Sequence, residues 1–180
     1  DVPALRALTG VEIVVPGTPA EFETLFRAAY ADGAPTYFRL SQQRNVDDRP
    51  VRFGQLEVVR HSTGAPVVIA VGPMLDRALA AAADLDVSVA YCTTAAPLDA
   101  ATLRELAGPE PTVLLIEPWH AGALIPDVVS ALGPGPIRVD AVGVPRGVTF
   151  GYGSADDHDR EYGLTPEGIA ERLRTFLRRA

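Results

Sequence analysis

Short apolar runs alternate with stretches of helical character along almost the whole chain of 180 residues. Strands that alternate with helices in this way are typical of a parallel sheet with helices on both faces. The alternation predicts an α/β fold: a three-layer, mostly parallel, doubly wound sheet, preceded by the tail of a second α/β domain. The strands of the main sheet are expected within residues 66–72, 86–92, 111–118 and 136–145, with an edge strand within 55–64.

A smaller strand and helix pattern precedes that sheet. The sequence predicts a short helix from Asp1, a strand within residues 11–17 and another within 35–40. Between the two strands, Thr18 is placed to cap a helix, and Glu21 is placed to complete a capping box with it. This βαβ pattern is the expected tail of the second domain.

A polar segment separates the two patterns. Residues 41–54 are polar and charged with almost no apolar periodicity, which is typical of a linker or a crossing loop. We therefore divide the chain into a first segment at 1–45, a linker at 46–57 and a second domain at 58–180.

The C-terminal stretch predicts an amphipathic helix. Thr165 stands at the N-cap position, directly before Pro166. Ile169, Leu173, Phe176 and Leu177 then recur at helical spacing and form one apolar stripe. We expect this stripe to cover one face of the main sheet, without a role in chemistry.

Charge and composition exclude several classes of protein. The net charge is -7, all 16 basic residues are arginines, and these are spread singly. Nucleic acid and anionic membranes are therefore not expected partners.

The single cysteine, Cys92, lies in an apolar run and is expected to be a buried small side chain. One cysteine cannot form an internal disulfide, so a reducing cytoplasm is the expected location, and no signal-peptide pattern is found. The abrupt start at Asp1 predicts that residues are missing upstream.

Motifs that bind nucleotides or metals are not found in the sequence. There is no G-x-G-x-x-G fingerprint and no G-x-S-x-G elbow, and a chain without lysine cannot contain a P-loop. His61, His120 and His158 are not spaced as metal ligands, and the aspartates around His158 suit the start of a solvated helix. The sequence therefore predicts no catalytic, cofactor-binding or metal-ligating residue in this chain.

Two places at the carboxyl ends of strands are candidates for ligand contacts. His120 lies between a strand and a helix, where packing with Trp119 under the helix is the alternative explanation. Arg39, at the end of the strand within 35–40, forms a cluster with Gln42, Gln43 and Arg44, which follow that strand. An arginine there could bind a phosphate or a carboxylate, although exposed arginines in a linker often bind nothing specific.

Six motifs in sequence order resemble the C-terminal part of the transketolase family of thiamine-diphosphate enzymes. That family also includes deoxyxylulose-phosphate synthases and the β subunits of 2-oxoacid dehydrogenase E1 components. No motif is specific alone, but together they cover essentially the whole chain. They stand at residues 1–30, 33–41, 67–74 (VVIAVGPM), 93–99 (TTAAPLD), 113–122 (VLLIEPWHAG) and 162–173 (YGLTPEGIAERL).

The resemblance implies a domain layout and a cofactor. Residues 1–45 would be the C-terminal end of the pyrimidine-binding domain, and 58–180 the complete transketolase C-terminal domain. Thiamine diphosphate and Mg²⁺ would be bound by parts outside this chain, because the family's G-D-G motif, its later asparagine and its activating glutamate have no counterpart here. The chain alone would then be inactive, and a diphosphate-binding subunit or domain would be its partner.

The resemblance also implies two substrate-binding residues. Transketolases often carry an arginine directly after the strand and its L-S pair, where it holds the sugar phosphate. Here Gln42 occupies that position and Arg44 follows two residues later. This departure counts against a phosphorylated sugar, unless Arg44 reaches back into the same site.

Two hypotheses for function follow. In the first, the chain is part of a transketolase-like transferase that moves a two-carbon ketol unit within a homodimer or heterotetramer. In the second, it resembles an E1 β subunit and acts mainly in dimerisation and in docking a carrier or acyltransferase domain.

Overall fold

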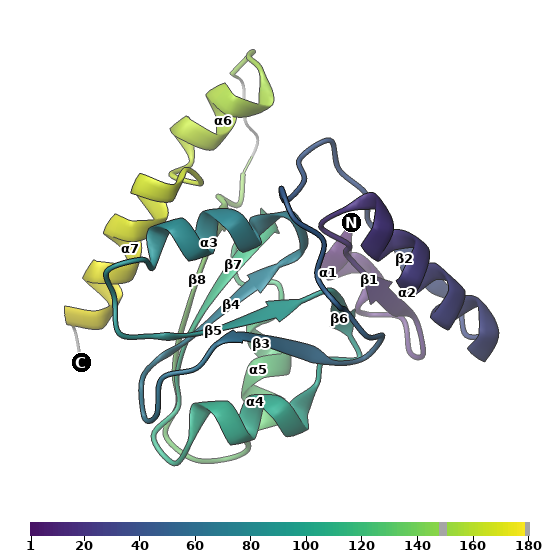
Figure 1. Ribbon diagram of the computed structural model, residues 1–180, viewed down its shortest axis with the longest axis horizontal. Helices are drawn as coiled ribbons and strands as arrows, with labels where there is room; N and C mark the ends of the chain where they lie inside the picture. The colour runs from purple at the N-terminus through teal and green to yellow at the C-terminus, as the bar shows by residue number, and fades with distance from the viewer. Residues whose placement is uncertain (148–150, 179–180) are drawn as a thin grey trace.

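The computed structural model describes residues 1–147 and 151–178, and its centre is a five-stranded sheet (Figure 1). The strands stand in the order β3-β5-β4-β7-β8, and all neighbours are parallel except β3, which pairs antiparallel with β5 at one edge. The mostly parallel doubly wound sheet and its edge strand are as predicted. The strands are β3 (Leu56–Arg60), β4 (Val67–Val71), β5 (Ser88–Cys92), β7 (Thr112–His120) and β8 (Arg138–Val144).

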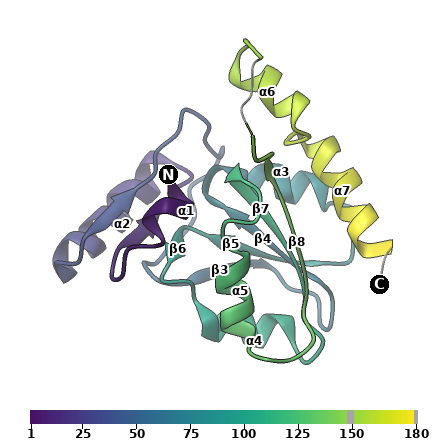
Figure 2. The ribbon, with the colours of Figure 1, turned by 180° about the vertical axis from the view of Figure 1, so that it is seen from behind.

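Helices cover both faces of this sheet, which confirms the three layers (Figures 1 and 2). Alternate residues of β4 point to opposite faces, so Val68 and Ala70 pack with one set of helices and Val67, Ile69 and Val71 with the other. On the first face lie η1 (Gly72–Met74), α3 (Leu75–Ala81) and α7 (Pro166–Arg178). On the second lie α4 (Ala100–Ala107) and α5 (Ile125–Leu132).

The predicted C-terminal helix α7 has the expected cap and the expected apolar stripe. The Gly168 N–H donates to Thr165 Oγ1 at 3.3 Å. Ile169, Leu173 and Phe176 are buried against the first face of the sheet. The helix is therefore held by its cap and by burial of that stripe.

A second, three-stranded sheet stands beside the first, in the order β2-β1-β6 (Figure 1). Strand β1 is parallel to β2 and antiparallel to β6. Strand β6, which was not predicted from the sequence, comes from the second part of the chain and joins it to the first. The elements here are α1 (Val2–Leu5), β1 (Glu12–Val14), α2 (Pro19–Asp32), β2 (Thr36–Phe38) and β6 (Thr94–Ala96).

The predicted capping box at α2 forms only in part. Thr18 Oγ1 accepts from the Glu21 N–H, as expected. The Glu21 carboxylate, however, accepts from the N–H of Gly17 and not from that of Thr18. The prediction for Glu21 was wrong in this respect because Glu21 is buried and has partners far away in the sequence.

The segment between the two parts is packed on both of them. The Val46 N–H donates to Asp76 Oδ2 at 2.6 Å in the second part, and the Arg49 N–H donates to Glu21 Oε1 at 3.1 Å in the first. Strand β3 already begins at Leu56, inside the predicted linker at 46–57. The division into domains stays a prediction. The segment that connects the two parts makes specific contacts.

Helix α6 (Ala155–Glu161) extends beyond the end of the main sheet (Figure 1). It is the predicted short acidic helix, and Ser154 and Asp157 cap it reciprocally. Part of the glycine-rich loop before it, residues 148–150, lies outside the described residues. Across the described chain, no helix has the length and apolar character needed to cross a membrane.

Candidate functional site

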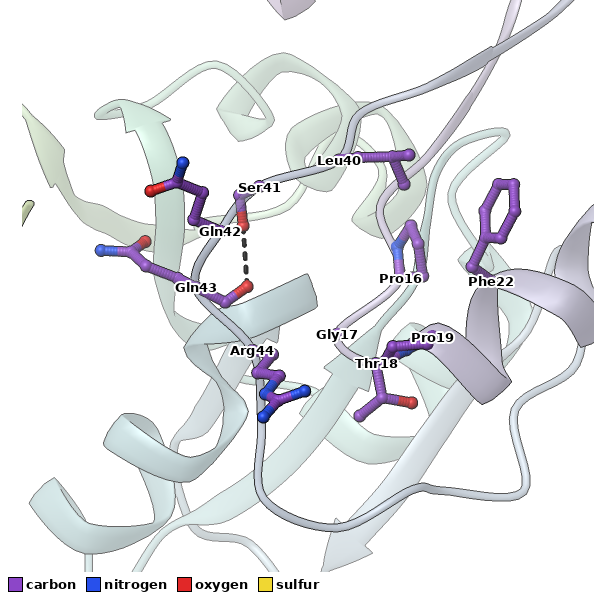
Figure 3. A pocket seen from close by; sticks show the side chains of 10 residues that line it. All are labelled: Pro16, Gly17, Thr18, Pro19, Phe22, Leu40, Ser41, Gln42, Gln43 and Arg44. Atoms are coloured by element: carbon purple, nitrogen blue, oxygen red, sulfur yellow. Dashed lines mark hydrogen bonds between the residues drawn. The ribbon is translucent and has the colours of Figure 1, made fainter.

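A cavity of about 520 Å³ lies where β1 and β2 end (Figure 3). The carboxyl ends of parallel strands meet at one edge of a sheet, and such an edge is the usual place for ligand contacts. One wall is the segment that follows β1 and begins α2, and the other wall is the segment that follows β2. The lining residues are Pro16, Gly17, Thr18, Pro19 and Phe22 on the first wall, and Leu40, Ser41, Gln42, Gln43 and Arg44 on the second.

A buried carboxylate supports the first wall from behind. Glu21 is 1% exposed, and its Oε2 accepts from the Gly17 N–H at 2.8 Å and from the Tyr91 hydroxyl at 2.6 Å. Its Oε1 accepts from the Arg49 N–H at 3.1 Å. Three segments of the chain therefore meet at one carboxylate, which fixes the loop before α2.

Asn45 extends this network to the main sheet. Its amide donates to the Gly72 carbonyl at 3.1 Å and to the Tyr91 hydroxyl at 3.2 Å. A Cβ on Gly17 would lie 2.1 Å from the Asn45 amide nitrogen and 2.2 Å from the Tyr91 oxygen. Only glycine fits at position 17 while both side chains keep these places.

Burial, together with the hydrogen bond to Glu21, raises the pKa of Tyr91 far above its ordinary value. The hydroxyl therefore stays protonated and donates to Glu21 at every physiological pH. The protonated Tyr91 hydroxyl is thus a donor that helps to hold the wall of the cavity.

The predicted substrate-binding residues Gln42 and Arg44 both line this cavity. Both side chains are exposed. Arg44 also borders a neighbouring cavity of about 400 Å³ with Thr18 and Asp48. In Figure 3 the side chains of Gln42 and Gln43 extend away from Phe22. Within the described chain Arg44 has no ion pair, so its guanidinium is available to an anion.

The other two members of the predicted cluster have partners inside the protein. Gln43 Nε2 donates to Asp159 Oδ2 at 2.6 Å, and Arg77 pairs with the same oxygen at 2.8 Å. Arg39 lies outside the cavity lining, pairs with Asp1 at 3.2 Å and stacks over Trp119. Burial lowers the pKa of Arg39 from its ordinary value.

At the second candidate place, Trp119 is buried but His120 is not. His120 is exposed, and its Nδ1 lies 3.0 Å from the Pro145 carbonyl oxygen. Packing under the helix, the alternative explanation, therefore holds for Trp119 alone. Trp119 Nε1 donates to Glu117 Oε1 at 3.0 Å.

Sequence reasoning missed Glu117, which is fully buried. Its carboxylate accepts from the N–H groups of Gly122 and Leu124, just before α5. Burial raises the pKa of Glu117, and these hydrogen bonds oppose that rise. One sequence signal could have indicated Glu117: a glutamate at the end of an apolar strand, followed by a glycine and a helix.

The predicted burial of Cys92 is confirmed. Burial first, and nearby carboxylates second, raise the pKa of its thiol to about 12. A thiol with that pKa is almost entirely protonated at neutral pH and is a weak nucleophile.

The residues that line the cavity do not fit Mg²⁺. This ion prefers carboxylate, phosphate and water oxygens, and the lining contains no carboxylate. Elsewhere in the part of the chain that the structure describes, no three His, Cys, Asp or Glu side chains gather in a way that could hold a metal ion. The cavity suits an organic ligand with an anionic group, next to Arg44.

Comparisons with known proteins find relatives along the whole chain, although no protein-family model matches it. An uncharacterized 33.6 kDa protein in the fasciation locus of Rhodococcoides fascians is 34% identical over 98% of this chain and 57% of its own length. Two 1-deoxy-D-xylulose-5-phosphate synthases match 99% of this chain. The Geobacter sulfurreducens synthase 2 is 28% identical over 31% of its length, and the Chlorobium luteolum enzyme 31% identical over 30%.

Two solved structures share the fold. A split gene transketolase, described as an inactive beta4 tetramer, has a TM-score of 0.83 and 26% identity over 98% of this chain and 61% of its own. A Campylobacter jejuni transketolase has a TM-score of 0.73 and 19% identity over 96% of this chain and 27% of its own, and this match concerns the fold alone. The chain thus spans between about a quarter and three fifths of these five proteins.

Proposed function

Because the chain belongs to the transketolase family, whose C-terminal part it matches in sequence and in fold, we propose that it is the C-terminal portion or subunit of a thiamine-diphosphate-dependent transferase. The reaction is the transfer of a two-carbon ketol unit. The observation that carries the proposal is the match of 98% of the chain to a split gene transketolase. The two 1-deoxy-D-xylulose-5-phosphate synthases support the same family.

In this proposal the cavity beside α2 contacts the substrate. Arg44 would bind an anionic group of the substrate through its guanidinium fork, and Gln42 would add amide hydrogen bonds. A phosphate is one such group, and Arg44 would then act in place of the arginine that transketolases often carry at the position of Gln42. Neither residue would touch the reacting carbon atoms.

Thiamine diphosphate, when bound, stabilises the carbanion on which such transfers depend. We assign the binding of the cofactor and of Mg²⁺ to parts of the protein outside this chain, because the cavity lining offers no carboxylate to the metal. This chain would supply the wall that orients the substrate and excludes water. It would be inactive without a diphosphate-binding subunit or domain.

Assembly with other subunits is part of the proposal. A homodimer or heterotetramer in the cytoplasm is the arrangement that we expect. The second hypothesis, an E1 β-like subunit that docks a carrier or acyltransferase domain, is not favoured, since the named relatives are synthases and transketolases.

Reconstitution tests this proposal. The purified chain is mixed with a diphosphate-binding transketolase subunit, and ketol transfer from a ketose to an aldehyde is measured with thiamine diphosphate and Mg²⁺. Activity is expected only for the mixture. A mixture that binds thiamine diphosphate but neither cleaves a ketose nor decarboxylates a 2-oxo acid would contradict the enzymatic role.

A further inference from the structure

Gln43 connects the second wall of the candidate cavity to helix α6. It lines the cavity, and its backbone carbonyl accepts from the Ser41 hydroxyl at 2.8 Å (Figure 3). Its side chain extends away from Phe22, and Nε2 donates to Asp159 Oδ2 at 2.6 Å. These two partners are 116 residues apart in the sequence. A residue of α6 therefore holds a residue of the cavity wall.

Asp159 is a buried carboxylate with two partners outside its own helix. It is 7% exposed. Arg77, in the first turn of α3, pairs with the same Oδ2 at 2.8 Å and also donates to the Leu164 carbonyl at 3.1 Å. A buried carboxylate is stable when it is paired and hydrogen-bonded, so these partners fix the place of Asp159. Helix α3, helix α6 and the cavity wall thus meet at one side chain.

Asn45 is anchored on the other side of Arg44. Its Nδ2 donates to the Gly72 carbonyl at 3.1 Å, and its Oδ1 accepts from the Asp76 N–H at 3.4 Å. Both partners belong to the second part of the chain, as Asp159 does. Arg44 therefore stands between two residues, Gln43 and Asn45, whose side chains are held by that part.

Burial along this segment follows the same alternation. Gln43 is half-buried and Asn45 is buried, whereas Arg44 between them is exposed. Arg44 has no ion pair among the residues that the structure describes. A long side chain and a loop lose conformational entropy when they bind a ligand, and a backbone that is already fixed reduces this loss. Anchors on both sides of Arg44 therefore favour binding of an anion by its guanidinium.

The hydrogen bond from Gln43 is not needed to balance the charge of Asp159. Arg77 already neutralises this carboxylate, at 2.8 Å. The bond fixes Gln43 instead, which would otherwise have no side-chain partner among the described residues. Its physical effect is therefore on the segment that lines the cavity.

We propose that Asp159 is a positioning residue of the candidate substrate cavity: through Gln43 it fixes the backbone that presents Arg44 to an anionic group. Helix α6 then belongs to the substrate site without touching the substrate, and Asp159 takes part in no chemical step. This inference rests on the proposed function, because the cavity is the one assigned to the substrate.

Titration with inorganic phosphate tests this role on the full 180-residue chain. The backbone amide signal of Arg44 is followed by NMR and gives the dissociation constant. Asp159→Ala should raise this constant about 10-fold, as expected for the loss of one hydrogen bond to a charged group.

Asp156→Ala is the matched control. Asp156 is an exposed carboxylate on the same helix, so its removal changes the net charge equally without touching Gln43. This variant should leave the dissociation constant unchanged. Equal constants for the two variants, or an Arg44 signal that does not respond to phosphate in the unaltered chain, would overturn the inference.

Gln43→Ala tests the same link from its other end. It leaves Asp159 paired with Arg77, so this variant should stay folded even if Asp159→Ala does not. The dissociation constant should rise by the same factor as in Asp159→Ala. If Asp159 acts through Gln43, the double variant should lose no more affinity than either single variant, because residues of one network are not additive. Losses that multiply would mean separate effects and would count against the proposal.

The reconstituted enzyme gives a second readout. Asp159→Ala should raise KM for a phosphorylated ketose and leave kcat nearly unchanged, because Asp159 contacts no reacting atom. A lower kcat with an unchanged KM would contradict the positioning role. If the unaltered assembly transfers no ketol unit, the proposed function fails, while the phosphate titration still decides the role of Asp159.

Discussion

Replacement of Arg44 is the simplest test of the candidate substrate cavity. Arg44 lines the cavity and has no ion pair within the described chain, so its charge is free to meet an anionic substrate. In the reconstituted enzyme, Arg44→Ala should raise KM for a phosphorylated ketose about 10- to 100-fold, which corresponds to a charged hydrogen bond of about 1.5–3 kcal/mol. The value of kcat should change little.

Arg52 provides the matched control for Arg44. It is exposed on the same connecting segment but does not line the cavity. Arg52→Ala should leave KM unchanged. If both variants raise KM equally, the effect comes from net charge and the role given to Arg44 is wrong.

Replacement of Tyr91 tests the hydrogen-bond network behind the cavity wall. The Tyr91 hydroxyl donates to Glu21 and accepts from Asn45 inside the protein. Tyr91→Phe removes a donor from a buried carboxylate and should lower the free energy of unfolding by about 1–3 kcal/mol. Chemical denaturation measures this change, and an unchanged midpoint would mean that the network contributes nothing.

Cys92 gives a prediction about pH. Because burial raises the pKa of its thiol to about 12, the thiolate fraction stays very small up to pH 8 and increases only toward that pKa. A thiol reagent at pH 8 should therefore label the folded chain hardly at all and the urea-unfolded chain completely. Rapid labelling of the folded chain would contradict the buried position.

At the scale of elements, the C-terminal helix illustrates what local sequence determines. Thr165→Ala removes the hydroxyl that accepts from the Gly168 N–H and should cost about 0.5–2 kcal/mol of stability. Because no residue of α7 lines the candidate cavity, ketol transfer should not change at a temperature where the variant is folded. Thermal unfolding and an activity assay on the same sample check both statements.

Local signals predicted most elements but not the contacts between them. Helix α2 begins with a cap and a proline, and β4 is a continuous apolar run, so short stretches of sequence were enough for both. Strand β6 has only three residues, Thr94–Ala96, and no periodicity to indicate it. Its pairing with β1 depends on residues about 80 positions away, which no local pattern contains.

The candidate site shows the same limit. Gln42 and Arg44 could be named because they follow a strand, where ligands usually bind. The support of the cavity could not be named, since Glu21 meets Tyr91 across 70 residues of sequence. Glu21 was understood only as part of a helix cap, which accounts for its spacing but not for its burial.

At the scale of the whole molecule, the two sheets differ in how far they are covered. The main sheet has helices on both faces, whereas the rings of Phe22, Phe26, Tyr30 and Phe38 lie beside the edge of β2 that no described strand pairs. The chain spans 57% or less of the relatives found by sequence. The account therefore requires further polypeptide for activity.

Binding of thiamine diphosphate and ketol transfer, measured side by side for the chain alone and for the chain with a diphosphate-binding subunit, tests this account most directly. The account predicts that the chain alone neither binds the cofactor in the presence of Mg²⁺ nor transfers a ketol unit, and that the mixture does both. Ketol transfer by the chain alone, or cofactor binding without transfer by the mixture, would contradict it.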